Sequence, residues 1–322
     1  MLFRSSRIPF IPVAGAAVNL RASDIGIAIN PHGNLYMLPN IAGFVGSDTV
    51  GVMLAVNFLE PGPPRLAIDV GTNGEVAVSA NGTLAVCSTA AGPALEGAAL
   101  SCGMRAASGA IEHISITDGE VACEVIDGIR PVGICGSGII DAVAELLDAG
   151  IVDSTGRLLD RDELAGTVPG SLLNRIVDVD GQNAFVFSRG DGGSESRDVI
   201  LSQRDIRHIQ LAKGAISAGM HLLLKELSLG PEDLSEVLLA GAFGNYIRKR
   251  SALRIGLLPP VGEDRIRFVG NAASTGAKMA LLSRAVRGDA DRIRRETRHV
   301  ELAALPEFMN AFSEHMMFPE KT

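Results

Sequence analysis

The chain has 322 residues, of which 47% are hydrophobic, 20% charged and only 4% aromatic. This length and apolar content suffice for one large or two ordinary domains, and the scarcity of aromatic side chains favours helices packed on a sheet over an aromatic-rich β-sandwich. A net charge of −8 argues against a general nucleic-acid or membrane-surface partner, because both need a positive field.

Four cysteines, Cys87, Cys102, Cys123 and Cys135, lie far apart and lack the spacing of a zinc or iron–sulfur site. We therefore expect free thiols in a reducing compartment, with no iron–sulfur cluster or corrinoid held by these cysteines. No run approaches the ~20 apolar residues that span a bilayer, and the N-terminus lacks the apolar stretch of a signal peptide. The predicted location is the cytoplasm.

Residues 1–60 are predicted to form a lead-in and a connecting helix, and the lead-in, up to about residue 40, is too thin to be a domain. Residues 25–29 and 35–38 are strand-like. A connecting helix is predicted next, with Ser47 or Asp48 as its N-cap. The Pro-Gly-Pro-Pro sequence that follows this helix ends it.

The most informative stretch is an apolar strand that ends near Asp69 and continues through a glycine-rich turn into a second strand. The dipeptide Asn73-Gly74 predicts a two-residue β-hairpin, and a third strand completes a meander. Such a turn would present the backbone N–H groups of Gly71, Thr72, Asn73 and Gly74 to an anionic oxygen, while Asp69 holds Mg²⁺ or a water. An ordinary hairpin with a capped turn is the alternative.

A second glycine-rich turn precedes another predicted helix. Gly136, Ser137 and Gly138 open this helix, and Gly150 ends it. Glycines at a helix N-terminus let an anion approach bare amides and the positive end of the helix dipole. Close packing of the helix on a strand explains the same glycines equally well.

Further elements surround these two turns. A helix over residues 94–100 and strands over 111–116 and 121–126 are predicted between them. The periodic pattern of the sequence then weakens. We expect an insertion over residues 161–200, in which residues 188–196 form a flexible surface loop.

A long helix of about twenty-five residues is predicted from the cap formed by Ser202 and Asp205. Lys213 stands near its middle. Its position is explained either by exposure on the protein surface or by a contact with a bound nucleotide.

The next apolar strand ends in small residues, among them Gly241, Ala242, Gly244 and Asn245. Such residues would admit a flat ligand against the backbone. Residues 268–277 repeat the order strand, glycine, helix, and a short helix in the tail is expected to pack back on the body.

Together these loops resemble the ATPase superfamily of actin, sugar kinases and acetate kinase. The resemblance is closer to the C-terminal ATPase domain of the reductive activators of corrinoid proteins. It implies an α/β fold of the actin and sugar-kinase type, which is ribonuclease H-like, with residues 61–322 as the nucleotide-binding domain. The segments that carry it are residues 68–75, 92–97, 133–138, 239–245 and 270–273.

The resemblance also implies roles for individual residues. Asp69 and Glu75 would be catalytic, and Asp69 would hold the metal. The bound cofactors would be ATP and Mg²⁺. The implied nucleotide-binding residues are Gly71, Thr72, Asn73, Gly74, Gly136, Ser137, Gly138, Lys213, Gly241, Ala242, Gly244 and Asn245.

Members of this family couple ATP hydrolysis to the return of a Co(II) corrinoid protein to Co(I), with an N-terminal iron–sulfur domain as electron donor. No D-x-G-T hairpin precedes Asp69 and the iron–sulfur cysteines are absent, so we expect a C-terminal part of such an activator, incomplete in its N-terminal half. The implied partners are a corrinoid protein of a methyltransferase system and either the missing N-terminal half or an iron–sulfur electron donor. A homodimer and independent ATP hydrolysis are left open.

Two other functions fit the residues. A small-molecule kinase of the same superfamily would need a general base, for which Asp69 or Asp141 is available. A non-enzymatic docking module is the third possibility.

Overall fold

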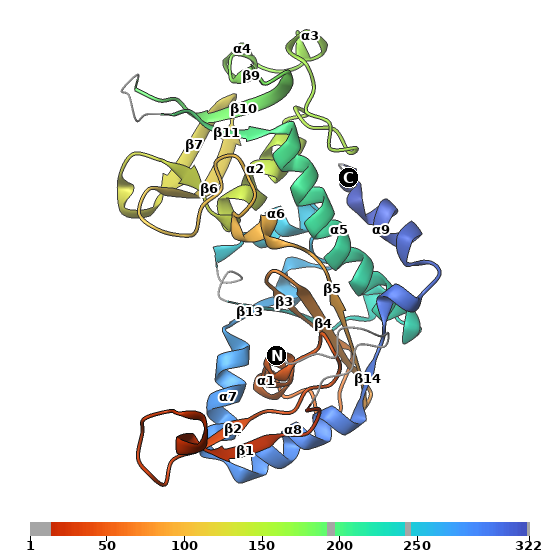
Figure 1. The fold of residues 1–322 in the computed structure, drawn as a ribbon. Coiled ribbons are helices and arrows are strands. Elements are labelled where there is room, and N and C mark those ends of the chain that lie inside the picture. The colour runs from red at the N-terminus through yellow and green to blue at the C-terminus, as the bar shows by residue number, and fades with distance from the viewer. Residues whose placement is uncertain (1–13, 192–196, 242–245, 321–322) are drawn as a thin grey trace.

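The computed structural model describes residues 14–191, 197–241 and 246–320. A six-stranded sheet forms the centre of the lower half of the molecule (Figure 1). β3, β4 and β5 form an antiparallel meander, whereas β12 is parallel to β3, β13 to β12 and β14 to β5. In sheet order the strands are β13 (Ile266–Gly270), β12 (Glu236–Ala240), β3 (Arg65–Val70), β4 (Gly74–Ala80), β5 (Thr83–Thr89) and β14 (Thr297–His299).

Both faces of this sheet are apolar, and helices cover both. Leu66, Ile68 and Val70 alternate with Ala67 along β3, so that the first three join one hydrophobic cluster and Ala67 joins the other. The long helix α5 (Gln203–Glu226) covers the first face, and α9 (Phe308–Met316) packs on α5. The second face is covered by α1 (Ser47–Ala55), α7 (Ala272–Leu282) and α8 (Arg284–Glu296).

Helices α1 and α7 cross at very short range on the second face. A Cβ atom on Gly276 would lie 2.0 Å from the carbonyl oxygen of Gly51, and a Cβ atom on Gly51 would lie 2.7 Å from the carbonyl oxygen of Ala273. Neither position has room for a side chain. The two glycines therefore allow the helix backbones to touch.

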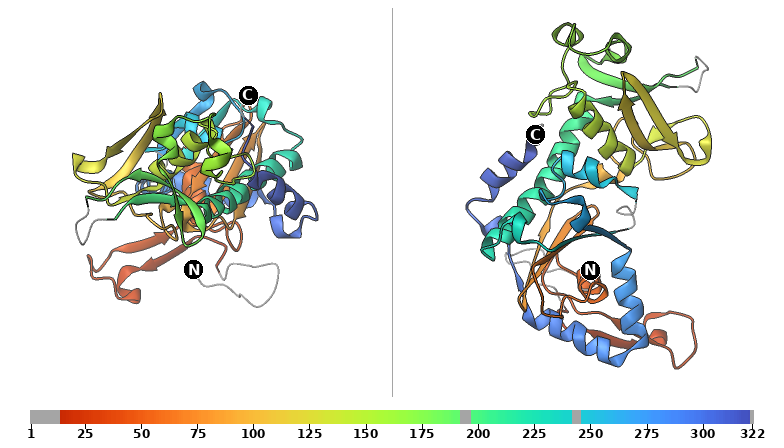
Figure 2. Two further views of the ribbon diagram at one scale, coloured as in Figure 1. Left: turned by 90° about the horizontal axis from the view of Figure 1, so that it is seen from above. Right: turned by 180° about the vertical axis from the view of Figure 1, so that it is seen from behind.

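The upper half of the molecule contains two smaller sheets beside helix α2, as the two views of Figure 2 show. One sheet has the order β7-β6-β8 and the other the order β11-β10-β9. The elements are β6 (Ala110–Thr117), β7 (Glu120–Val125), β8 (Gly133–Ile134), α2 (Gly136–Asp148), α3 (Arg161–Leu164), α4 (Gly170–Leu173), β9 (Ile176–Val179), β10 (Gln182–Ser188), β11 (Val199–Ser202) and α6 (Lys249–Arg254).

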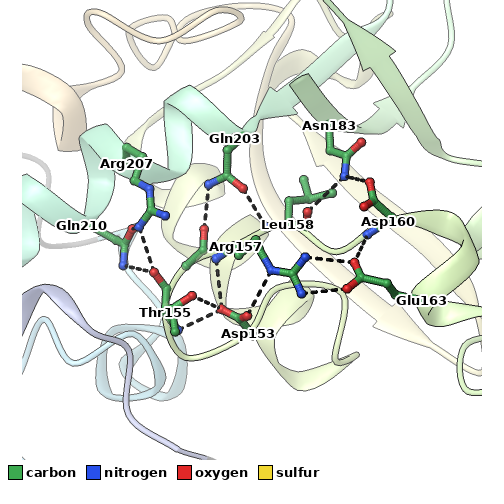
Figure 3. Close-up of polar contacts among 11 residues, drawn as sticks. Asp153, Thr155, Arg157, Leu158, Asp160, Glu163, Asn183, Gln203, Arg207 and Gln210 are labelled. Carbon is green, nitrogen blue, oxygen red and sulfur yellow. Dashed lines mark hydrogen bonds and ion pairs between the residues drawn. The ribbon is translucent and has the colours of Figure 1, made fainter. Parts of the chain in front are cut away.

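Side chains in the first half of α5 hold the segment that follows α2 by hydrogen bonds to its backbone (Figure 3). Gln203 accepts from the Leu158 N–H at 2.7 Å and donates to the Gly156 carbonyl at 2.7 Å. Arg207 and Gln210 both donate to the Thr155 carbonyl oxygen, at 2.8 and 3.0 Å. This helix therefore joins the two halves of the molecule.

Several predicted elements are confirmed, and α5 is the clearest. Its N-cap Ser202 accepts from the Asp205 N–H, and the Asp205 carboxylate accepts in return from the Ser202 N–H. The strands predicted over residues 111–116 and 121–126 correspond to β6 and β7. Strong local signals, capping and alternation, therefore determined these elements.

Two predicted elements are wrong. Residues 94–100 contain only the 3₁₀ turn η2 (Pro93–Glu96), because Gly97 adopts a left-handed conformation that ends it. Residues 25–29 are not a strand. The observed ribbon pairs β1 (Val18–Arg21) with β2 (Asn34–Met37), and the chain between them forms the connection, including the 3₁₀ turn η1 (Ala22–Ile25).

The described part of residues 161–200 contains α3, α4, β9, β10 and the start of β11. The predicted loop over residues 188–196 lies partly outside the described residues. Within the described ranges, no helix is long and apolar enough to cross a membrane.

Candidate active site

The turn between β3 and β4 contains three residues rather than two. Val70 pairs with Gly74, so residues 71–73 form the loop, and the Gly71 N–H donates to the Asn73 carbonyl at 3.0 Å. The predicted two-residue turn is therefore wrong, because Gly74 belongs to β4. A Cβ atom on Gly74 would lie 2.6 Å from a side chain of α5. One of the four N–H groups expected to face an anion is thus bonded within the turn.

The loop is also tied to the segment that follows β5. Thr72 donates its hydroxyl to Glu96 at 2.9 Å, and its carbonyl oxygen accepts from the Gly92 N–H at 2.8 Å. The side chain of Thr72 is therefore positioned by η2, which in turn packs against both α2 and α5. This contact links the hairpin to the upper half of the molecule.

Asp69 and Glu75 lie opposite each other in the register of β3 and β4. By the alternation of β3, the Asp69 side chain shares the α1 face with Ala67. Burial raises the pKa of Asp69, and the nearby charge of Asp48 raises it further. Burial, reinforced by the charges of Asp48 and Asp69, raises the pKa of Glu75 to about 7.

Asp48 is the residue that sequence reasoning missed, since it was considered only as a helix cap. The N-cap is Gly46, because Ser47 turns its hydroxyl away from the helix to the Leu38 carbonyl at 2.7 Å. Asp48 lies instead in the first turn of α1, where its charge acts on the hairpin acids. The neighbouring Thr49 hydroxyl is buried without a partner among the described residues. No spacing signal along the chain indicates this proximity.

The hairpin meets the ends of two other strands. Gly241 follows β12 with φ +100°, a conformation that suits glycine, and its N–H donates to the Gly270 carbonyl at 3.0 Å. A Cβ atom on Gly241 would lie 3.0 Å from Asp69 Oδ1. The carboxyl ends of the parallel strands β3, β12 and β13 therefore meet beside Asp69, the position where open α/β sheets bind ligands. Ala242, Gly244 and Asn245 lie outside the described residues.

The carboxylates do not form a complete metal cage. In the ranges that the structure describes, no three His, Cys, Asp or Glu side chains are arranged to hold a metal ion. A Mg²⁺ ion does not need such a cage, since it commonly keeps several waters and binds through one or two carboxylates and substrate phosphates. Asp69 fits that mode, with its half-buried carboxyl and the bare backbone of Gly241 beside it.

The second glycine-rich turn is packed tightly. Gly136, Ser137 and Gly138 are buried in the first turn of α2. A Cβ atom on Gly138 would lie 2.4 Å from the Ile111 carbonyl oxygen of β6. This geometry satisfies the packing explanation of these glycines, and their contact with a nucleotide stays a prediction.

One of the two interpretations of Lys213 expected it on the protein surface, and this interpretation is wrong. Only 1% of the area of Lys213 is exposed, and its ammonium donates to the Met317 carbonyl of the C-terminal tail. Burial lowers the pKa of Lys213 to about 7. It lies on α5, which covers the sheet face opposite α1, so the structure does not bring it together with Asp69 and Glu75.

Asp141, the other candidate base for a kinase, is fully buried in α2. Its Oδ2 atom lies 2.9 Å from His113 Nδ1 and 3.5 Å from Arg248 Nε. Arg248 also donates to the Ile114 carbonyl at 3.0 Å. Asp141 thus holds the start of α6 against β6, and this arrangement does not favour a role as an accessible base.

The central sheet, the helices on both of its faces and the acidic hairpin have the architecture of the ASKHA class. A family model described as the C-terminal domain of RACo, the ASKHA domain, matches residues 64–322, and one described as the RACo middle region matches residues 4–60. The chain therefore belongs to the RACo family of reductive activators. Both the expected α/β ATPase fold and the expected family are confirmed.

The names of similar proteins agree with this family assignment. The chain is 40% identical over 311 residues to the corrinoid activation enzyme RamQ of Eubacterium limosum, covering 96% of this chain and 52% of the relative. It is 28% identical over 298 residues to the [Co(II) methylated amine-specific corrinoid protein] reductase of Methanosarcina barkeri, covering 85% and 49%. A solved structure of a reductive activator for corrinoid, iron–sulfur protein superposes with a TM-score of 0.87 at 35% identity, covering 98% and 49%. The chain thus spans about half the length of these relatives.

Proposed function

We propose that this chain is the nucleotide-binding ATPase part of a reductive activator that returns a Co(II) corrinoid protein to Co(I). The observation that carries the proposal is the meeting of Asp69 near the carboxyl end of β3, Glu75 at the start of β4 and Gly241 directly after β12. The family and the names of the relatives support the same activity.

The residues of the hairpin have distinct roles in this proposal. Asp69 holds Mg²⁺, which neutralises phosphate charge when it is bound with ATP. Glu75, with a pKa of about 7, is poised to accept a proton from a water at neutral pH. The charge of Asp48 raises that pKa, so Asp48 is a positioning residue.

Calorimetric titration with ATP and Mg²⁺ tests the nucleotide site. We expect Asp69→Asn to weaken binding at least about tenfold, because the metal loses a charged ligand. Asp118→Asn is the matched control: Asp118 lies in the exposed β6–β7 turn with φ 52°, which asparagine tolerates. Equal affinity of both variants and the wild type, or an absence of nucleotide binding, would contradict the proposal.

The partner is tested separately. We expect a Co(II) corrinoid protein of a methyltransferase system to bind this chain, and a non-hydrolysable ATP analogue to change the affinity, because a nucleotide that prefers one conformation shifts its population. Binding that ignores the nucleotide in the wild type would favour the docking module instead. ATP turnover that requires a small acceptor would favour the kinase.

A further inference from the structure

A large hollow lies along α5, on the side of the sheet away from the hairpin acids. Its volume is about 1040 Å³, and we call it the α5 pocket. Besides α5 and α6, it is lined by residues 228–231, by residues 258–261 and by parts of the tail between residues 314 and 320. Asp69 and Glu75 do not line it. The α5 pocket is therefore separate from the proposed nucleotide site.

The buried lining of the α5 pocket is mostly apolar. Met220, Leu224, Leu258 and Phe318 are among its buried lining residues. The ammonium of Lys213 lies 5.0 Å from the centroid of the Phe318 ring and donates to one backbone carbonyl. Such walls, with few polar groups, are typical of small-molecule sites.

Lys213 differs from the other cations of the lining. Arg250 and Arg254 pair with Asp148 at 2.9 and 2.6 Å, and Lys225 pairs with Glu307 at 2.9 Å. Lys213 has no carboxylate within 4 Å among the described residues. Its burial therefore carries a desolvation penalty that no anion of the described chain offsets.

The remaining polar groups inside the α5 pocket do not supply a negative charge. Ser217 and His315 form a hydrogen bond at 2.8 Å, and the rings of His221 and His315 lie 5.2 Å apart. Burial lowers the pKa of His315, and the charges of His221 and Lys213 lower it further, which disfavours the charged imidazolium. The lining carboxylates Glu263, Glu314 and Glu320 are exposed at the rim, where water solvates them.

We propose that the α5 pocket binds a small organic carboxylate with an apolar body, whose carboxylate pairs with Lys213. The apolar body would remove the walls of the pocket from water, and the carboxylate would supply the missing counter-charge. This site does not depend on the proposed nucleotide binding, so either proposal can fail without the other.

Fluorescence of anilinonaphthalene sulfonate, an apolar anion that brightens in an apolar environment, reports occupancy. We expect one site per chain, from which octanoate displaces the dye at least about tenfold more effectively than octanol, because only octanoate can form the charge-assisted pair. In Lys213→Met this preference for octanoate disappears. In Lys225→Met, which removes an exposed paired cation, it changes less than about threefold.

Two results would overturn the proposal: octanoate and octanol displacing the dye equally from the wild type, or an unchanged octanoate preference in Lys213→Met. Circular dichroism and urea unfolding show whether the variants keep the fold. Should Lys213→Met unfold, Val261→Phe provides an independent test. Val261 is a half-buried lining residue, and its enlargement should weaken octanoate binding by reducing the volume of the pocket. Unchanged octanoate binding in Val261→Phe would mean that octanoate binds outside the α5 pocket, and it would also overturn the proposal.

Discussion

Glu75 is the residue whose chemistry depends most on its neighbours. Its ordinary pKa is 4.5, but burial and the charges of Asp48 and Asp69 raise it to about 7. At pH values between 4.5 and about 7, Glu75 keeps its proton in the folded protein, whereas the unfolded chain releases it. The resulting stabilisation is complete below pH 4.5 and is lost as the pH rises through about 7.

Glu75→Gln should therefore change the pH dependence of stability. We expect the variant to be more stable than the wild type at pH 8, by up to about 3 kcal/mol, because a neutral amide avoids the cost of a buried charge. At pH 4, below the ordinary pKa of Glu75, the difference should nearly vanish. Urea unfolding at both pH values measures it, and the exposed substitution Glu120→Gln is the control. An equal difference at both pH values would show that Glu75 does not titrate as described.

The roles of individual residues were only partly predictable. Asp69 and Glu75 follow from their adjacent places on a hairpin, which is a local pattern. Asp48 stands about twenty residues earlier, and its influence arises from the packing of α1 on the sheet. The burial of Lys213 depends on the tail, more than a hundred residues later. Local patterns cannot reveal such contacts.

At the scale of elements, the crossing of α1 and α7 limits what the second face of the sheet tolerates. Gly51 and Gly276 bring the two helix backbones into contact. Because α1 carries Asp48, whose charge acts on Asp69, the crossing also fixes the helix from which this charge acts on the hairpin. Its geometry is therefore relevant to the candidate site as well as to stability.

Gly276→Ala should destabilise the protein by about 1–3 kcal/mol, because the added methyl group would overlap the Gly51 carbonyl and force the helices apart. Gly288→Ala in α8 is the matched control. No atom lies within 4 Å of its added Cβ, so we expect about 0.5–1 kcal/mol of stabilisation from higher helix propensity. Urea unfolding measures both, and a Gly276→Ala variant as stable as the wild type would contradict the close crossing.

For the whole molecule, the C-terminal tail connects distant parts of the fold. Phe318 is buried, and its N–H donates to the Ser154 carbonyl at 2.8 Å. Arg254 donates to the Pro319 carbonyl at 2.7 Å, and Gln210 donates to the Met316 carbonyl at 3.0 Å. The tail thereby joins α5, α6 and the segment after α2.

Phe318→Ala should lower the free energy of unfolding by about 3 kcal/mol, because a large buried ring leaves a cavity. Met309→Ala is the control on α9, since 64% of Met309 is exposed and its truncation should change stability by less than about 0.5 kcal/mol. Thermal or urea unfolding compares the two. A similar small effect of both variants would mean that the tail does not stabilise the body.

The sequence by itself determined the local elements: the capped helix α5, the β3–β4 hairpin with its acids, and the family to which the chain belongs. Capping, alternation and turn chemistry act between residues close in the chain, so they can be read without a structure. Only the tertiary structure placed Asp48 beside Glu75, moved Gly74 into β4, and enclosed Lys213 behind the tail. Those features arise from packing between segments far apart in the chain, where burial and charge are decided together.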